Sequence, residues 1–344
     1  MLGKLIINKH ASQHYKTFFN QNNGFFLRAE ENGYPEPFWS KDGPELLDVS
    51  ITNYCGRECE FCYRQANKKG HHILFNDMQN IVDQAKKAGV LQMALGGGNP
   101  NQHPDFIEIL HLIRDNNIVP TYTTNGDGLS DEVLNATKEC CGAMAVSLYA
   151  PYEGYEELLN RIYSFGIRCN LHIILKNDTI DILSNWLLEP PPFFKYVNAL
   201  IVLNYKPIIG DSNQVVKDSV KLRPFYDAVS KCTSIKIGFD SCCIPGIVSY
   251  MKNAKSVLVE SCESARFSAF ISEDMKMFPC SFMAHTDKYG DLRKDSLLEI
   301  WTKNKAFIEH RNRILENQCP TCKHQSICNG GCVFMSQINQ CQNP

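Results

Sequence analysis

The segment Cys55-Gly56-Arg57-Glu58-Cys59-Glu60-Phe61-Cys62-Tyr63 places three thiols within eight residues, separated by three residues and then by two. No fourth cysteine lies near them in the sequence, whereas a closed structural metal site takes four protein ligands. Three thiolates could therefore bind three irons of a [4Fe–4S] cluster and leave the fourth iron open to a small molecule. Thiolates also bind zinc and Cu(I), so a zinc knuckle is the alternative interpretation.

Apolar segments and amphipathic segments alternate along the chain from Leu46 onward. This pattern predicts strands over 46–52, 91–95, 119–124, 143–148, 167–175 and 199–203. It predicts helices over 76–88, 105–116, 130–139, 155–165, 181–188 and 218–232. Six such units favour a parallel sheet with helices outside it and ligands at the carboxyl ends of the strands.

The region before the first of these strands contains one strong turn signal. The stretch 18–28 predicts a hairpin, because an Asn-Gly pair separates two aromatic segments. We expect residues 1–45 to form a cap over one end of the main domain. Their composition does not resemble a separate peptide-binding domain.

The loops after the predicted strands carry polar residues and glycines that suit a ligand site. Gly96-Gly97-Gly98-Asn99-Pro100 follows the second strand, and glycines let the backbone approach a ligand or another backbone closely. Thr124 and Asn125 follow the third strand, and Ser147 lies on the fourth. Asn170 and His172 lie on one face of the fifth strand, where a core histidine is an equally good interpretation of His172. Tyr205 and Lys206 follow the sixth strand, either at the mouth of the barrel or on a surface loop.

The C-terminal part is rich in cysteine. Cys319, Cys322, Cys328 and Cys332 have the spacing C-x2-C-x5-C-x3-C, and Cys341 follows. Cys242, Cys243, Cys262 and Cys280 precede them, the last after a hairpin with a turn predicted at 273–276. Paired zinc sites are the alternative to iron–sulfur clusters here.

Together these motifs resemble the radical S-adenosylmethionine (SAM) enzymes with a C-terminal SPASM-type extension. The resemblance implies an α/β fold, an open (β/α)6 partial TIM barrel with a small cysteine-rich domain that binds Fe–S clusters. It divides the chain into an N-terminal cap (1–45), a barrel (46–232) and an auxiliary-cluster domain (233–344).

The resemblance also implies the roles of individual residues. Cys55, Cys59 and Cys62 would hold the [4Fe–4S] cluster to which SAM binds. Residues expected to bind SAM are Tyr63, Gly96, Gly97, Gly98, Asn99, Thr124, Asn125, Ser147, Asn170 and His172, with Asn99 where the family usually has Glu. Two auxiliary [4Fe–4S] clusters would use Cys242, Cys262, Cys280 and Cys332, and Cys319, Cys322, Cys328 and Cys341. We prefer Cys242 to Cys243 as the fourth ligand of the first of these. Met275 replaces a usual glycine of the extension.

Composition bears on the binding partners and on the compartment of the protein. The formal net charge of −2 gives no electrostatic reason to expect nucleic acid or membrane binding. The sequence has no signal peptide and no apolar run of about 18 residues, so we expect a cytoplasmic protein whose 16 cysteines serve metal ligation or redox chemistry.

The expected activity is reductive cleavage of SAM to a 5′-deoxyadenosyl radical that abstracts a hydrogen atom from a substrate. By the resemblance, the substrate is a ribosomally made peptide or protein, and the modification is a crosslink, a thioether or an epimerisation. A flavodoxin- or ferredoxin-type donor would supply the electrons. Asp240 is a candidate acid–base group facing the substrate. Action on a small molecule, or maturation of an anaerobic sulfatase or a dehydrogenase, is the alternative, although Ser281 replaces the Asp usual in sulfatase-maturing relatives. An electron carrier without SAM chemistry is the alternative from another class.

Overall fold

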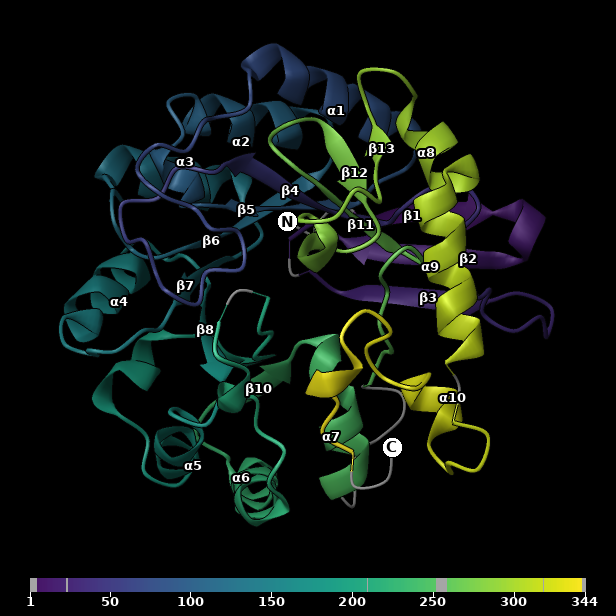
Figure 1. The fold of residues 1–344 in the computed structure, drawn as a ribbon. Helices are drawn as coiled ribbons and strands as arrows, with labels where there is room; N and C mark the ends of the chain where they lie inside the picture. Colours follow the sequence, from purple (N-terminus) through teal and green to yellow (C-terminus); the bar gives the residue numbers. More distant parts are fainter. Residues whose placement is uncertain (1–4, 23, 209, 252–258, 318, 342–344) are drawn as a thin grey trace. The chain divides into compact units, whose positions relative to one another are not determined.

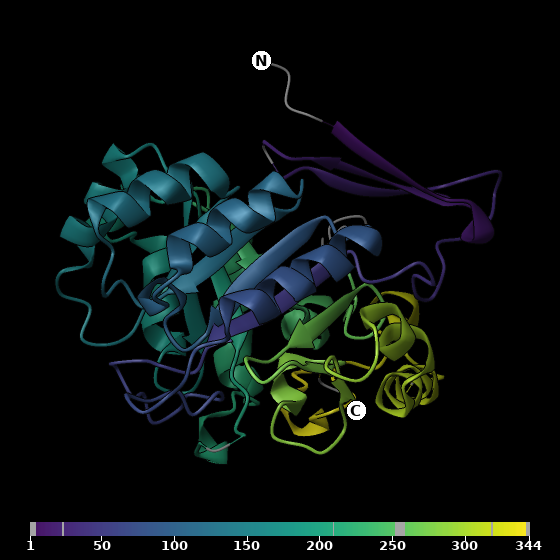
Figure 2. The same cartoon turned by 90° about the horizontal axis from the view of Figure 1, so that it is seen from above.

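The computed structural model describes all residues except 1–4, 23, 209, 252–258, 318 and 342–344. It contains two compact units, and Figures 1 and 2 show their helices and strands from two directions. The first unit comprises Met1–Arg57, Ala66–Met144 and Ser264–Glu309, and the second comprises Glu58–Gln65, Ala145–Glu263 and His310–Pro344.

The first unit contains a parallel sheet extended by an antiparallel hairpin. Its strands lie in the order β6-β5-β4-β11-β12-β13, and β11 pairs parallel to β4. The helices α1, α2 and α3 follow β4, β5 and β6 and lie beside one another (Figure 1). The bounds are β4 Leu46–Thr52, α1 Phe75–Lys87, β5 Gln92–Gly97, α2 Phe106–Asp115, β6 Val119–Thr124, α3 Asp131–Cys140, β11 Ser268–Ile271, β12 Lys276–Phe278, β13 Gly290–Asp291 and α8 Leu297–Lys303, followed by α9 Lys305–Glu316, which continues into the second unit.

The second unit contains four strands in the order β7-β8-β9-β10, with β9 parallel to both β8 and β10. Helices alternate with these strands and cysteine-rich segments follow them. The bounds are β7 Met144–Ser147, α4 Tyr155–Ser164, β8 Cys169–Leu175, α5 Ile180–Leu188, β9 Ala199–Asn204, α6 Ser219–Lys231, β10 Lys236–Phe239, α7 Ile244–Tyr250 and α10 Gln325–Cys328.

The predicted alternation of strands and helices is confirmed. All six strands and all six helices are present, with ends that differ from the prediction by two residues at most. Local chemistry explains several boundaries. Ser130 begins α3 because its hydroxyl accepts the Val133 N–H, and Ser296 begins α8 in a capping box with Glu299.

The N-terminal residues form a separate three-stranded antiparallel sheet of β1 (Leu5–His10), β2 (Tyr15–Asn20) and β3 (Phe26–Glu30). The hairpin predicted over 18–28 is β2 and β3, whereas β1 was not predicted. Phe19 packs against Leu91 and Val119, which lie at the amino ends of β5 and β6. The sheet therefore caps the end of the first unit opposite to the turns that follow the parallel strands.

A buried ion pair joins this cap to the start of the parallel sheet. Arg28 Nε lies 2.7 Å from Glu45 Oε2, and both side chains are less than one-tenth exposed. The guanidinium carbon of Arg28 also lies 3.8 Å from the centre of the Phe267 ring. Glu45 immediately precedes β4, and its backbone N–H donates to Phe267 O, so the pair joins the cap to the start of the parallel sheet.

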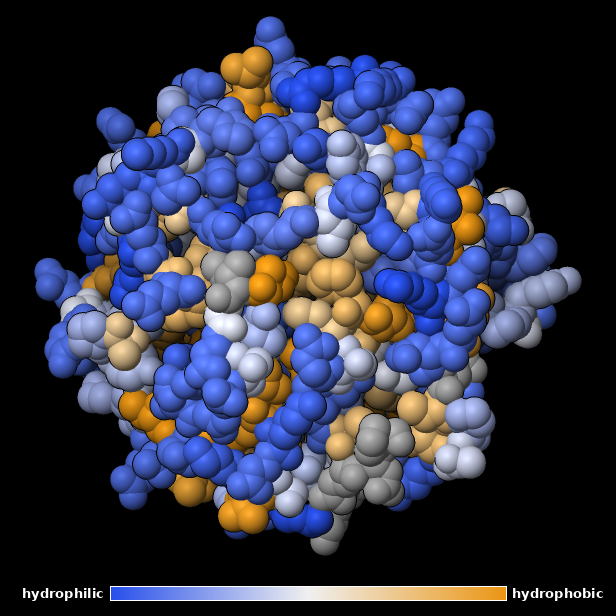
Figure 3. All heavy atoms as spheres, in the orientation of Figure 1, coloured by the Kyte–Doolittle hydropathy of each residue, from blue (hydrophilic) through white to orange (hydrophobic). Residues whose placement is uncertain are grey.

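Hydrophilic residues cover most of the face seen in Figure 3, with smaller apolar areas between them. Among the described residues, no helix has the length and apolar character needed to cross a bilayer.

We predict that Arg28→Met lowers the free energy of unfolding by about 3–5 kcal/mol, because it leaves the Glu45 carboxylate buried without its cation. Lys16→Met is the matched control. Lys16 forms a more exposed pair with Glu31, so this substitution should lower the free energy of unfolding much less than Arg28→Met does. Urea unfolding of the two variants measures the difference. Equal losses would show that the Arg28–Glu45 pair does not hold the cap.

Candidate functional site

In the first unit, main-chain contacts position the segment that leads to Cys55. Gly98 N–H donates to Thr52 O at 2.7 Å, and Asn99 N–H donates to Tyr54 O at 2.9 Å. A Cβ on Gly98 would lie 2.0 Å from Tyr54 O, whereas a Cβ on Gly96 would have no atom within 4 Å. Glycine at 98 is therefore required by the contact between two backbones, while Gly96 lies open.

The side chain of Asn99 joins the turn after β5 to the turn after β6. Its carbonyl oxygen accepts from Thr124 Oγ1 at 2.8 Å and from Asn125 N–H at 3.2 Å. Its amide donates to Asp127 O at 2.9 Å. Asn99 and Thr124 are each 1% exposed, and their side chains are engaged with each other and with neighbouring turns.

Asn125 connects these turns to Cys55, the first cysteine of the motif. Its Nδ2 donates to Cys55 Sγ at 3.7 Å. An amide aimed at sulfur suits a thiolate that ligates a metal, because hydrogen bonds to sulfur are one of the levers that tune iron–sulfur clusters. In the first unit, the structure thus brings together Cys55, the glycine turn, Thr124 and Asn125.

We predict that Gly98→Ala destabilises the protein by at least about 3 kcal/mol, since the new methyl group would overlap a fixed carbonyl. Gly96→Ala should change stability by less than about 1 kcal/mol, because the site is open and its backbone does not need glycine. Thermal unfolding checks both variants. If the two substitutions cost the same, the backbone contact with Tyr54 is not what demands glycine at 98.

In the second unit, the other two thiols of the motif lie beside an aromatic pair. Cys62 N–H donates to Cys59 O at 3.0 Å, which makes a tight turn. The Phe61 ring between them has its centre 5.5 Å from that of Tyr149. Tyr63, also expected at the SAM site, is half-buried next to Cys62.

Tyr149 was missed in the sequence analysis, although it follows β7 at its carboxyl end. Burial raises the pKa of its phenol, a hydrogen bond to Ser147 opposes the rise, and the charges of Cys59 and Cys62 add to it. Ser147, Tyr149 and these two thiols are therefore neighbours within the second unit. The alternation of side chains along β7 could have found Tyr149, because it lies two residues beyond Ser147.

Asn170 and His172 occupy one face of β8, as the alternation predicted, and both are half-buried. Asn170 Oδ1 accepts from Asn198 Nδ2 at 2.9 Å. Burial lowers the pKa of His172 to about 4, although the charge of Asp240 works in the opposite direction. His172 is accordingly a neutral imidazole at neutral pH.

The structure distinguishes the adjacent cysteines after β10. The Cys242 thiol is hydrogen-bonded to Cys332, and both residues pack against the apolar cluster formed by Tyr205, Val215, Met335 and Ile338. Met335 N–H donates to Cys332 Sγ at 3.3 Å. Cys243 is fully buried and its thiol lies 3.8 Å from Val202 O. Of the two adjacent cysteines, Cys242 is thus the one that contacts Cys332.

Tyr205 and Lys206 are buried, so their interpretation as surface residues was wrong. Lys206 Nζ donates to Asn204 O at 2.9 Å and forms an ion pair with Asp240 Oδ2. Asp240 Oδ1 also accepts from Asn204 N–H at 3.1 Å. The carboxylate proposed as an acid–base group is thus engaged on both oxygens.

Four other cysteines line one cavity of about 670 Å³ in the second unit. Cys319, Cys322, Cys328 and Cys341 line it together with α7 residues such as Val248 and Tyr250. Burial raises the pKa of Cys328 to about 11, and the neighbouring Cys341 adds to the rise. Four cysteines with no carboxylate among the other described lining residues form a donor set of the type that binds a [4Fe–4S] cluster or zinc.

Cys280 follows the β11–β12 hairpin in the first unit, and Cys262 lies in the second. The turn of this hairpin has Met275 in the left-handed region with φ of +66°, where a glycine is usual in the extension. Met275 N–H donates to Ser272 O, Leu292 N–H donates to Met275 O, and the side chain is fully buried. Burial of the thioether chain offsets the roughly 1–2 kcal/mol that a side chain costs in this conformation.

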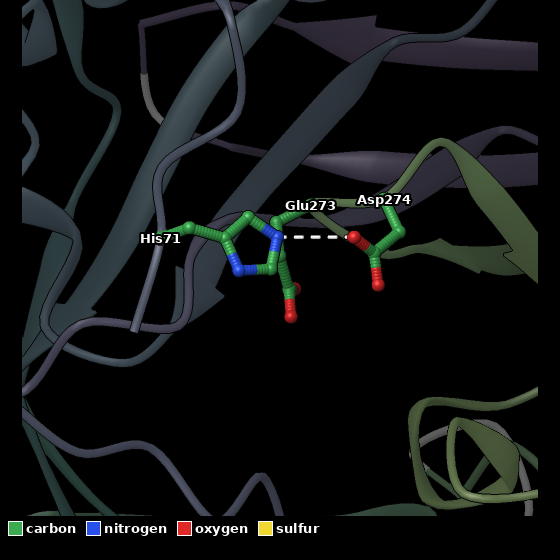
Figure 4. Close-up of side chains that lie close together, drawn as sticks. All are labelled: His71, Glu273 and Asp274. Atoms are coloured by element: carbon green, nitrogen blue, oxygen red, sulfur yellow. Dashed lines mark hydrogen bonds and ion pairs between the residues drawn. The ribbon is translucent and has the colours of Figure 1, made fainter. Parts of the chain in front are cut away.

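A second group with possible metal ligands was not predicted. His71 Nε2 lies 3.0 Å from Asp274 Oδ1, and the Glu273 carboxylate lies beside them (Figure 4). Glu273 is buried and accepts a hydrogen bond from Ser50. Since each of the three already has a partner within the protein, we assign no metal to this group.

Comparisons with known proteins agree with the motifs. Residues 49–188 match the family described as the Radical SAM superfamily, and residues 262–324 match SPASM, an iron–sulfur cluster-binding domain. Mycofactocin maturase MftC of Mycolicibacterium smegmatis is 21% identical over 318 residues, which cover 85% of this chain and 79% of that protein. AdoMet-dependent heme synthase of Methanosarcina barkeri is 20% identical over 321 residues, covering 84% and 91%.

Solved structures share the fold. SuiB of Streptococcus suis bound to S-adenosylmethionine superposes with a TM-score of 0.74 and 15% identity, covering 98% of both chains. anSMEcpe with bound AdoMet and the Cp18Cys peptide gives a TM-score of 0.61 and 16% identity, covering 87% of this chain and 91% of the other. The α/β fold expected from the sequence is confirmed.

Proposed function

Because the chain belongs to the radical SAM superfamily and carries a C-terminal SPASM domain, we propose that it modifies a ribosomally made peptide or protein by hydrogen-atom abstraction. The protein is a radical SAM enzyme with a SAM-binding iron–sulfur cluster and auxiliary iron–sulfur clusters in its SPASM domain. When bound to the reduced cluster, SAM supplies a 5′-deoxyadenosyl radical that removes a hydrogen atom from the substrate.

In this proposal the chain's residues hold the cofactors and exclude water. Cys55, Cys59 and Cys62 bind the cluster, and the open backbone at Gly96 contacts the SAM methionine group. Phe61 and Tyr149, whose rings pack against each other at a tilt, help to exclude water from the cluster loop. Cys242, Cys262, Cys280 and Cys332 hold one auxiliary [4Fe–4S] cluster, and the four cysteines of the cavity hold the second. A flavodoxin- or ferredoxin-type protein supplies the electrons.

The observation that carries the peptide assignment is the likeness to SuiB along 98% of both chains, which therefore includes the N-terminal region. SuiB has been solved with its precursor peptide SuiA, and MftC is named a maturase. Maturation of an anaerobic sulfatase is disfavoured by Ser281, which follows Cys280.

The N-terminal sheet has features that suit an extended peptide. Its two outer strands, β1 and β3, are edges of a sheet that no other described strand joins. Ile7, Phe18 and Leu27 form one cross-strand row, and Ile7 and Leu27 are about half exposed. Edge strands accept added strands through their free backbone groups, while exposed apolar side chains supply specificity.

A small-molecule substrate is the second candidate, because the relatives include a heme synthase at similar identity. The two candidates differ in one measurable respect. A peptide maturase must bind a polypeptide, whereas an enzyme acting on a cofactor precursor need not. Incubation with SAM, reductant and short peptides encoded beside this gene, followed by mass spectrometry, separates the two by hydrogen loss from a peptide.

We predict about twelve irons per chain after anaerobic reconstitution, as expected for three four-iron clusters. Reduction by dithionite should then release 5′-deoxyadenosine and methionine from SAM. The Cys55/Cys59/Cys62→Ala triple variant should keep about eight irons and lose this cleavage, because only the SAM cluster is removed.

Iron and sulfide quantification together with chromatography of the products tests both parts. Cys140→Ala is a control, since Cys140 is buried in α3 and belongs to none of the assigned cysteine groups. Cleavage of SAM by the triple variant would contradict the assignment of the cluster. Four irons or fewer in that variant would contradict the two auxiliary clusters.

A further inference from the structure

A buried cation lies beside the cysteine pair assigned to the first auxiliary cluster. Lys206 follows β9 and its side chain is 5% exposed. Its ammonium group forms an ion pair with the Asp240 carboxylate and donates to Asn204 O at 2.9 Å. Lys206 is therefore positively charged.

The Lys206–Asp240 ion pair lies next to Cys242 in the second unit. Asp240 precedes Cys242 by two residues, and its backbone oxygen accepts from Cys243 N–H at 2.9 Å. Both charges of the ion pair therefore lie close to Cys242.

A network of amides fixes this arrangement. Asn204 Nδ2 donates to Cys242 O at 3.0 Å and to Ile338 O at 3.1 Å, while Gln340 Nε2 donates to Asn204 Oδ1. Tyr226 OH in turn donates to Gln340 Oε1 at 2.8 Å. The backbone of Asn204 is bonded to both members of the pair, through its oxygen to Lys206 and through its N–H to Asp240. The ion pair is therefore held at a fixed position relative to Cys242.

We propose that the Lys206–Asp240 pair sets the reduction potential of the auxiliary cluster bound by Cys242 and Cys332. This inference rests on the proposed function, because it requires that cluster. Lys206 acts as a positioning and charge-bearing residue and not as a ligand. Net charge near an iron–sulfur cluster is one of the factors that determine its potential.

The direction of the effect follows from electrostatics. Reduction of the cluster from [4Fe–4S]2+ to [4Fe–4S]+ adds one electron from the external donor to a group already made negative by its thiolates. A buried cation stabilises the more negative, reduced state and raises the potential. Removing Lys206 also leaves the Asp240 carboxylate unbalanced, which lowers the potential further.

The experiment uses the full chain carrying the Cys55/Cys59/Cys62→Ala substitutions, so that only the auxiliary clusters contribute signals. Four variants are made in this background: Lys206→Gln, Lys206→Arg, Asp240→Asn and Lys221→Gln. Lys221 is the matched control, because it pairs with Asp181 on the surface of the same unit. Iron content is measured first, and potentiometric titration followed by electron paramagnetic resonance then gives the potential of each cluster.

We expect Lys206→Gln to lower the reduction potential of one cluster only. At a fixed applied potential, the ratio of reduced to oxidised cluster should fall at least about tenfold, which corresponds to about 59 mV for a one-electron couple. Lys206→Arg should retain the parent potential, because it keeps the charge. Asp240→Asn should have a higher potential than Lys206→Gln, because it removes the opposite charge. Lys221→Gln should match the parent.

Unchanged potentials in fully loaded Lys206→Gln would overturn the proposal, as would a lower potential in Asp240→Asn than in Lys206→Gln. If the glutamine variant loads fewer irons, Lys206→Met takes its place in the same comparison. Loss of a cluster from both neutral variants but not from Lys206→Arg would overturn tuning in favour of a purely structural role. A parent chain with fewer than about eight irons would instead count against the proposed function.

Discussion

The close approach of two backbones, between the turn after β5 and the segment from Thr52 to Tyr54, is the contact on which the first half of the site depends. This contact leaves no room for a side chain at position 98, so glycine is required there whether or not a ligand binds. Main-chain hydrogen bonds do not depend on side-chain rotamers, and here they position Tyr54, the residue just before Cys55. Pre-positioned ligands lose less entropy when a metal group binds.

Much of the fold could be predicted because it rests on local patterns. Strands and helices of the six units show clear periodicity, and residues such as Ser130 mark their ends. β1 escaped prediction because its exposed face carries Leu5, Ile7 and Lys9, so that its burial alternates without an alternation of apolar and polar residues. Its pairing with β2 is seen only in the folded structure.

Part of the candidate site could likewise be predicted from the sequence, and part could not. Cysteine spacing predicted the thiols of the candidate site, and Cys242, the predicted fourth ligand, contacts Cys332 in the structure. The alternation along β7 could also have indicated Tyr149, but the buried state of Lys206 could not be deduced, because a polar residue after a strand can face either solvent or the interior. The partner of Lys206, Asp240, lies 34 residues away in sequence, and no local pattern encodes such a distant ion pair.

The bonds of Asn204 to Ile338 and Gln340 join positions 134 and 136 residues apart. Contacts of such separation close large loops and form late. A chain truncated before Ile338 would lack both of these bonds. The side chain of Asn204, which donates to Cys242 O, would then lose the two contacts that fix its position.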